Sequence, residues 1–168
     1  VREGERVPFQ PPFGAVFAVF WAYFDDVPNA GLSSERVRRA ALFFGHLVLQ
    51  AGCVGLAIGF VVLSEDTSTR AAWAAATFAC ASVACIYVGL ALIGVGGRRT
   101  PIGPLTTLRI VTGALAVLIA PILHLGSWVD PNAVAFVLAA LMILHGFIAD
   151  RLRARTSVVG VHEDAAVS

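Results

Sequence analysis

Charged residues divide the chain into long apolar intervals, and this division is its dominant pattern. Four charge-free intervals, of 25, 27, 20 and 19 residues, lie between residues 40 and 149. A helix rises about 1.5 Å per residue, so about 20 apolar residues cross the hydrocarbon core of a bilayer. Each interval is therefore long enough for a membrane-spanning helix. We predict four firm spans, at residues 40–63, 71–96, 104–125 and 131–149.

A fifth, weaker span is predicted at residues 9–25. Pro11 and Pro12 interrupt its first half and Pro8 directly precedes it, which leaves only residues 13–24 for an unbroken helix. Twelve residues reach about 18 Å, less than the roughly 30 Å of the hydrocarbon core. The predicted fold class is therefore an all-α, polytopic transmembrane bundle over residues 1–150. Residues 151–168 carry no periodic apolar face, and we expect them to form a disordered cytoplasmic tail.

The composition excludes a soluble domain. The chain is 58% hydrophobic and 14% charged, whereas soluble domains are about 45–50% apolar and about 25% charged. Its net charge of +1 gives no basic surface for nucleic acid, so the expected partner is the lipid bilayer. The three cysteines, Cys53, Cys80 and Cys85, all fall inside predicted spans. We interpret them as packing residues, with no metal site or cofactor.

The arginines predict the orientation of the chain, because short arginine-rich loops stay in the cytoplasm. One predicted side holds eight arginines and the other only Arg2, Arg6 and Arg70. We therefore expect the C-terminus in the cytoplasm and the chain in the bacterial inner membrane. The arginine-rich side carries Arg36, Arg38, Arg39, Arg98, Arg99, Arg151, Arg153 and Arg155.

Polar side chains inside the spans are the candidates for function, since an unpaired polar group is costly in lipid. Six of them lie in the half of the bundle predicted to face the cytoplasm, where they could meet at one site. Such a cluster would bind a proton or a small polar solute, as in a transporter. The predicted polar site consists of Asp25, His46, Gln50, Tyr87, Arg109 and His145.

Other interpretations of these residues stay open. The polar groups could have a purely structural role and form hydrogen bonds between helices, with Arg109 extending to the lipid headgroups. His46 and His145 lie at similar depth, and two histidines on different helices could ligate a b-type haem. No nucleophile, zinc or phosphate-binding motif is present, so we predict no catalytic residue and no enzymatic activity.

Small residues on the second span predict close helix packing. Gly55 and Gly59 form a small-x-x-x-small motif, and Gly52 lies one turn earlier. Such motifs let two helices approach closely, within one chain or between two. The chain could therefore be a structural or accessory subunit, packed against a second copy or against another membrane subunit.

One segment resembles the bacterial low-temperature-requirement A (LtrA) family. Phe20-Trp21-Ala22-Tyr23-Phe24-Asp25 is similar to a Trp-x-Tyr-Phe-Asp motif at a helix end in that family. An arginine-rich stretch at 36–39 and a helix with His46 and small residues follow in the family's order, and Arg109 matches a recurrent arginine. The resemblance covers about residues 13–120. It implies a multi-helix membrane protein with a stress-related role and supplies no catalytic residues.

The chain departs from the pattern of this family in its first half. The family's acidic-aromatic motif of the Phe-Phe-Asp-Leu-Val type is missing, and members of the family are considerably longer. We therefore expect the chain to be a C-terminal part, or a truncated or short relative, of such a protein.

Overall fold

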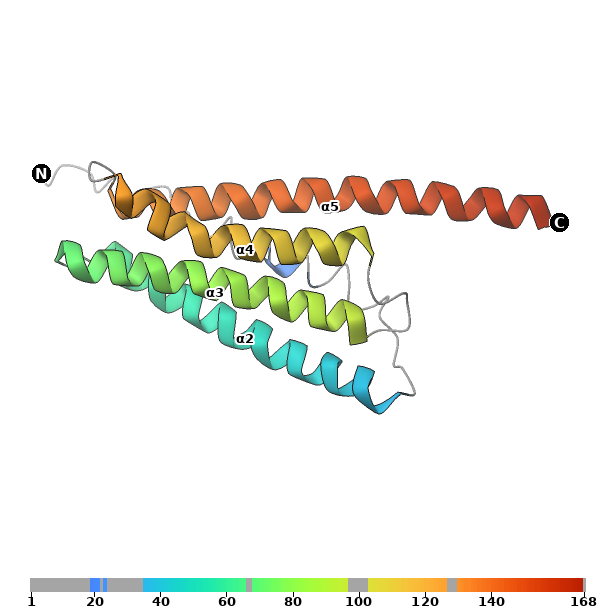
Figure 1. Ribbon diagram of the computed structural model, residues 1–168, viewed down its shortest axis with the longest axis horizontal. Coiled ribbons are helices and arrows are strands. Elements are labelled where there is room, and N and C mark those ends of the chain that lie inside the picture. Colours follow the sequence, from blue (N-terminus) through green and yellow to red (C-terminus); the bar gives the residue numbers. More distant parts are fainter. Residues whose placement is uncertain are drawn as a thin grey trace, which may run out of the picture.

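The computed structural model describes residues 19–21, 23, 35–65, 68–96, 103–126 and 130–167, with side chains as far as Ala154. Every regular element in this part of the chain is an α-helix, which confirms the predicted fold class. The four long helices run alternately up and down (Figure 1). They are α2 (Arg36–Ser64), α3 (Thr69–Gly96), α4 (Pro104–Leu125) and α5 (Asn132–Val167).

Each of the four firm predicted spans corresponds to one of these helices, and each is long and apolar enough to cross a membrane. The chain is therefore a multi-pass membrane protein. The predicted fifth span, 9–25, lies almost wholly outside the described residues. Within it the structure describes only residues 19–21 and 23, which are helical. The spanning part of α5 is Asn132–Ala154. Its backbone continues as helix to Val167, where a disordered tail was expected. The domain boundary at residue 150 stays a prediction.

Local sequence signals explain where two of the helices begin. Pro104 is the first residue of α4 and follows Gly103, which has an extended backbone. Proline suits this position because its missing N–H would have no partner within the helix. At the start of α5, Oδ1 of Asp130 accepts a hydrogen bond of 2.8 Å from the backbone N–H of Asn132. Asp130 therefore caps the helix.

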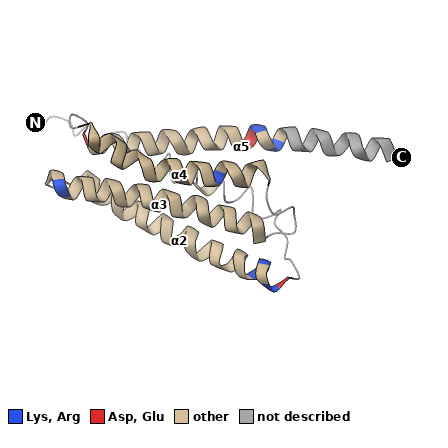
Figure 2. Ribbon diagram, viewed as in Figure 1, with Lys and Arg blue, Asp and Glu red and all other residues tan. Residues whose placement is uncertain are grey.

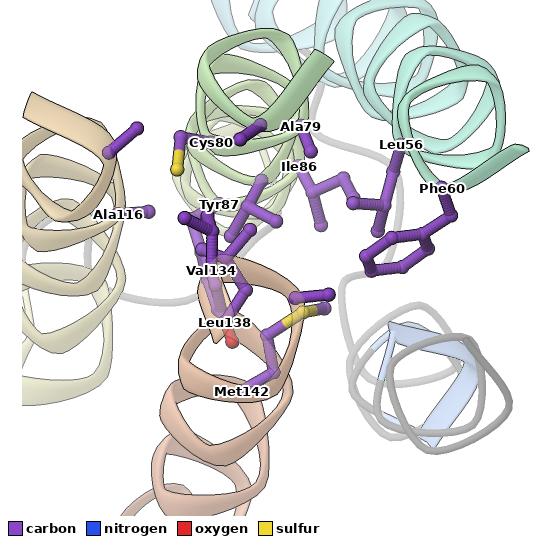
Figure 3. Packing of buried hydrophobic residues seen from close by; sticks show 14 of the residues in the cluster. Leu56, Phe60, Ala79, Cys80, Ile86, Tyr87, Ala116, Val134, Leu138 and Met142 are labelled. Atoms are coloured by element: carbon purple, nitrogen blue, oxygen red, sulfur yellow. The ribbon is translucent and has the colours of Figure 1, made fainter. Parts of the chain in front are cut away.

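α3 is the central helix. It packs along α2 on one side and along α4 on the other, while α5 packs against α4 and, less extensively, against α3 (Figure 1). Figure 3 shows side chains of all four helices meeting around it. The labelled residues of this core are Leu56 and Phe60 of α2; Ala79, Cys80, Ile86 and Tyr87 of α3; Ala116 of α4; and Val134, Leu138 and Met142 of α5.

Glycines bring the backbones of α2 and α3 into direct contact. A Cβ atom at Gly52 would lie 2.8 Å from the carbonyl oxygen of Ser82 and 2.9 Å from the backbone nitrogen of Ile86. One at Gly59 would lie 3.0 Å from the Cβ of Ala79. Gly55 is also buried on this side of α2. The three glycines predicted to pack helices therefore lie at a contact within the chain.

The charged residues gather at the ends of the membrane-spanning parts of the described helices (Figure 2). Arg36, Arg38 and Arg39 begin α2, and Arg151 and Arg153 lie on α5 toward the same end of the bundle. We call this the arginine-rich end. Arg70 lies at the opposite end, at the start of α3 (Figure 2). The described exception is Arg109, which lies within α4 itself.

Candidate functional site

Three helices bury polar side chains together in the half of the bundle nearer the arginine-rich end. Tyr87 comes from α3, Arg109 and Thr112 from α4, and His145 from α5. Their exposed fractions are between 2% and 4%, so they face the protein and not lipid. We call these four residues the buried polar cluster. Three of them, Tyr87, Arg109 and His145, belong to the predicted site.

Arg109 faces α3. Its Nη1 donates a hydrogen bond of 3.0 Å to the carbonyl oxygen of Leu90. Gly94, one turn further along α3, leaves room for the guanidinium group, because a Cβ there would lie 3.0 Å from Nη1. With 2% of its surface exposed, Arg109 is enclosed by the helices and does not extend to the headgroups. A buried charge inside a membrane span is the usual sign of function.

His145 joins α5 to α4 through Thr112. The Nδ1 atom of His145 lies 2.9 Å from the hydroxyl oxygen of Thr112. The same hydroxyl lies 2.8 Å from the carbonyl oxygen of Leu108, one turn earlier on α4. Nδ1, the hydroxyl and the carbonyl therefore form a continuous chain of hydrogen bonds.

Tyr87 packs against the other side of this arrangement. Its ring centroid lies 4.4 Å from that of His145, with the two ring planes inclined at 53°. Figure 3 places Tyr87 among the side chains of the core of the bundle. The positive charges of Arg109 and Arg153 both act on His145, and Arg153 pairs with Asp150 at 3.0 Å. The imidazole is thus held between a phenol ring and a hydroxyl.

The remaining predicted site residues do not join this cluster. His46 is half-buried on α2; its Nδ1 donates to the carbonyl oxygen of Leu42 at 2.7 Å. Its ring meets that of Tyr23 edge-on, with centroids 5.8 Å apart. Gln50 lies on the exposed side of α2. Asp25 is outside the described residues. The structure therefore brings together the α3, α4 and α5 members of the predicted site, and not those of α2.

This geometry does not favour a haem between His46 and His145. The two rings pack against different tyrosines, Tyr23 and Tyr87, and no described contact joins them. Among the described residues, no group of three histidine, cysteine or acidic side chains could hold a metal ion. The chemistry that the cluster can perform is the binding and release of protons at His145, beside a fixed positive charge.

Two buried threonines of α4 were not predicted as site residues. Thr106 and Thr112 lie three residues to either side of Arg109 and share its buried face. The signal was present in the sequence, because this spacing puts all three on one side of a helix. It is weak, since a threonine hydroxyl can bond to the carbonyl one turn earlier in its own helix and then needs no other partner.

One comparison with known proteins gives a match. The family model described as "Bacterial low temperature requirement A protein (LtrA)" matches residues 11–146. This range contains α2, α3 and α4, the first part of α5 and all four residues of the buried polar cluster. No curated protein and no solved structure matches the chain.

Proposed function

Because the chain belongs to the bacterial low temperature requirement A family of membrane proteins, we propose that it is a transport protein of the bacterial inner membrane. In this proposal the buried polar cluster takes up and releases a proton during transport, and His145 is the group that carries it. The protein acts as a transporter and not as an enzyme.

The observation that carries the proposal is the burial of His145 beside Arg109. Both lie inside membrane-spanning helices, with 4% and 2% of their surfaces exposed. Ionisable side chains in such positions are costly, and in transporters they form proton and ion pathways. Histidine is the side chain best suited to gain and lose a proton near neutral pH.

Proton movement in vesicles tests the proposal. The purified protein would be placed in liposomes that contain a pH-sensitive dye, and a membrane potential would be applied with potassium and valinomycin. We expect a change of internal pH with the wild-type protein. His145→Gln should reduce its rate to that of protein-free vesicles, because the amide cannot carry the proton.

His124→Gln is the matched control. His124 lies in the last turn of α4, at the end of the bundle opposite the arginine-rich end. It is exposed, and its ring packs on that of Trp73 with centroids 4.6 Å apart. This variant should keep the wild-type rate. Equal rates in wild-type and His145→Gln vesicles would contradict the proposed role of His145.

The arginines support a cytoplasmic C-terminus. Arg36, Arg38, Arg39, Arg151 and Arg153 share one end of the bundle (Figure 2), and arginine-rich ends stay in the cytoplasm. A fluorescent protein that matures only in the cytoplasm, fused after Ser168, should fluoresce. An alkaline phosphatase that is active only in the periplasm, fused at the same place, should be inactive. The reverse pair of results would contradict this orientation.

The family description supports a role in growth at low temperature, which we propose as the cellular setting of this transport. A strain that lacks the gene should grow more slowly in the cold, with a smaller difference at its optimal temperature. The wild-type gene should restore growth, whereas the gene for His145→Gln should not.

A second candidate function, that of an accessory subunit which associates with a second copy of itself, is favoured by Gln50. This amide lies on the exposed side of α2, near the middle of a span, where lipid offers no hydrogen-bond partner. Gln50→Leu should then lower the yield of crosslinked dimers in membranes. Unchanged crosslinking, or a wild-type protein that is monomeric, would count against this candidate.

A further inference from the structure

The hydroxyl of Thr112 lies between two polar atoms, and its single proton can go to only one of them. On one side, at 2.8 Å, is the carbonyl oxygen of Leu108. On the other side, at 2.9 Å, is Nδ1 of His145. A carbonyl oxygen can only accept hydrogen bonds, whereas an imidazole nitrogen can donate or accept according to where its proton is.

Counting protons decides the direction of both bonds. The bond to Leu108 requires that Thr112 donates its proton to the carbonyl. The oxygen of Thr112 then has only lone pairs left, so it can only accept from His145. Nδ1 of His145 must therefore carry a proton whether the ring is neutral or charged.

From this geometry we infer that Thr112 is a positioning residue that fixes the tautomer of His145. It holds the neutral ring with its proton on Nδ1 and makes Nε2 the one position where a proton is gained or lost. The use of Nε2 in transport rests on the proposed function. The tautomer itself does not, because it follows from the hydrogen bonds alone.

The groups around the imidazole are consistent with a fixed ring. Tyr87 of α3 packs against its face, with centroids 4.4 Å apart. The other charged groups that act on it are Arg109 of α4 and Arg153 of α5. Both are cations and cannot accept a proton from Nδ1. Thr112 is thus the acceptor that the described structure provides for Nδ1.

Nitrogen NMR of the protein labelled with ¹⁵N-histidine tests this inference directly. In the neutral state of wild-type protein, Nδ1 of His145 should resonate as a protonated ring nitrogen and Nε2 as an unprotonated one. Thr112→Val has nearly the same shape but no hydroxyl. It should move the proton to Nε2 in a large share of molecules. Thr112→Ser keeps the hydroxyl and should restore the wild-type pattern.

His46 provides a control inside the same molecule. Its Nδ1 donates to a backbone carbonyl, that of Leu42, at 2.7 Å, and Thr112 takes no part in this bond. Its signals should show a protonated Nδ1 in all three proteins, which also reports that the variants are folded. The loss of one set of signals in His145→Gln assigns the resonances of His145.

The outcomes separate this inference from the proposed function. If Nδ1 of His145 stays protonated to the wild-type extent in Thr112→Val, the inference is overturned, whatever the proton flux. If the tautomer changes and the flux falls, both are supported. If the tautomer changes while Thr112→Val and His145→Gln both move protons at the wild-type rate, the inference stands and the proposed function fails.

Discussion

Arg109 is the residue whose position most needs a physical explanation. A charged side chain costs about 2.5–3.5 kcal/mol at the centre of a membrane helix, and this is an upper bound for Arg109, which is the sixth residue of α4. Here the charge is turned toward α3, where Nη1 bonds to the carbonyl of Leu90. A hydrogen bond that involves a charged group contributes about 1.5–3 kcal/mol. The contact therefore offsets much of the cost, and Gly94 permits it because it has no side chain.

At the same scale, the ring of Tyr87 should contribute more to stability than its hydroxyl. The side chain is 3% exposed and packs on His145. Tyr87→Ala would leave a cavity and should cost about 3 kcal/mol or more of unfolding free energy. Tyr87→Phe keeps the ring contact and should cost about 1 kcal/mol at most. Denaturation in mixed detergent micelles measures both, and equal losses would show that the hydroxyl, not the ring, matters.

At the scale of elements, α2 and α3 behave as one unit because their backbones touch. Gly45 and Gly52 of α2 both face backbone atoms of α3, and Gly89 of α3 faces the backbone of Leu49. Between membrane helices, packing and interhelical bonds hold the elements together, since lipid is as apolar as the side chains. Close backbone contact is therefore the main source of stability for this pair.

A matched pair of glycine substitutions tests this contact. A Cβ at Gly52 would lie 2.8 Å from the carbonyl oxygen of Ser82, whereas one at Gly146 of α5 would meet nothing within 4 Å. Gly52→Ala should destabilise the protein by about 1–3 kcal/mol through overpacking. Gly146→Ala should stabilise it by about 0.5–1 kcal/mol, because alanine favours the helix. Thermal unfolding in detergent compares the two. A stable Gly52→Ala variant would contradict the contact.

The four firm spans and their approximate bounds could be predicted from the sequence, because charges are excluded from the membrane and mark the ends of spans directly. The first residue of α4, Pro104, was predicted correctly for a local reason. Which polar side chains of different helices contact each other could not be predicted in the same way. His46 and His145 have similar depth, but which way each helix turns its polar face depends on contacts with its neighbours. Thr112 gave only a weak signal, because a threonine hydroxyl can bond within its own helix, as that of Thr112 does to Leu108.

At the scale of the whole molecule, the arrangement of helices separates two groups of polar residues that were predicted as one. α2 packs along α3, while α5 packs mainly against α4. His46 therefore meets Tyr23, and His145 meets Tyr87 and Thr112. The bundle places the buried polar cluster between α3, α4 and α5, away from the glycine contact of α2 and α3.

Crosslinking in membranes tests this separation. In a background with Cys53, Cys80 and Cys85 replaced by alanine, a cysteine pair at positions 112 and 145 should react with a short bifunctional thiol reagent. The reason is that these two side chains lie within hydrogen-bond distance, 2.9 Å. A pair at positions 46 and 145 should not react, because α2 packs along α3 whereas α5 packs mainly against α4.

The two pairs share one cysteine, at position 145, so each serves as the control for the other's accessibility. Efficient crosslinking of 46 to 145 would unite His46 with the buried polar cluster and contradict the helix arrangement. Failure of 112 to 145, in protein that is inserted and folded, would contradict the contact between α4 and α5. The expected pattern limits the proton-handling residues to α3, α4 and α5. Flux measurements on variants of His46 should then give wild-type rates.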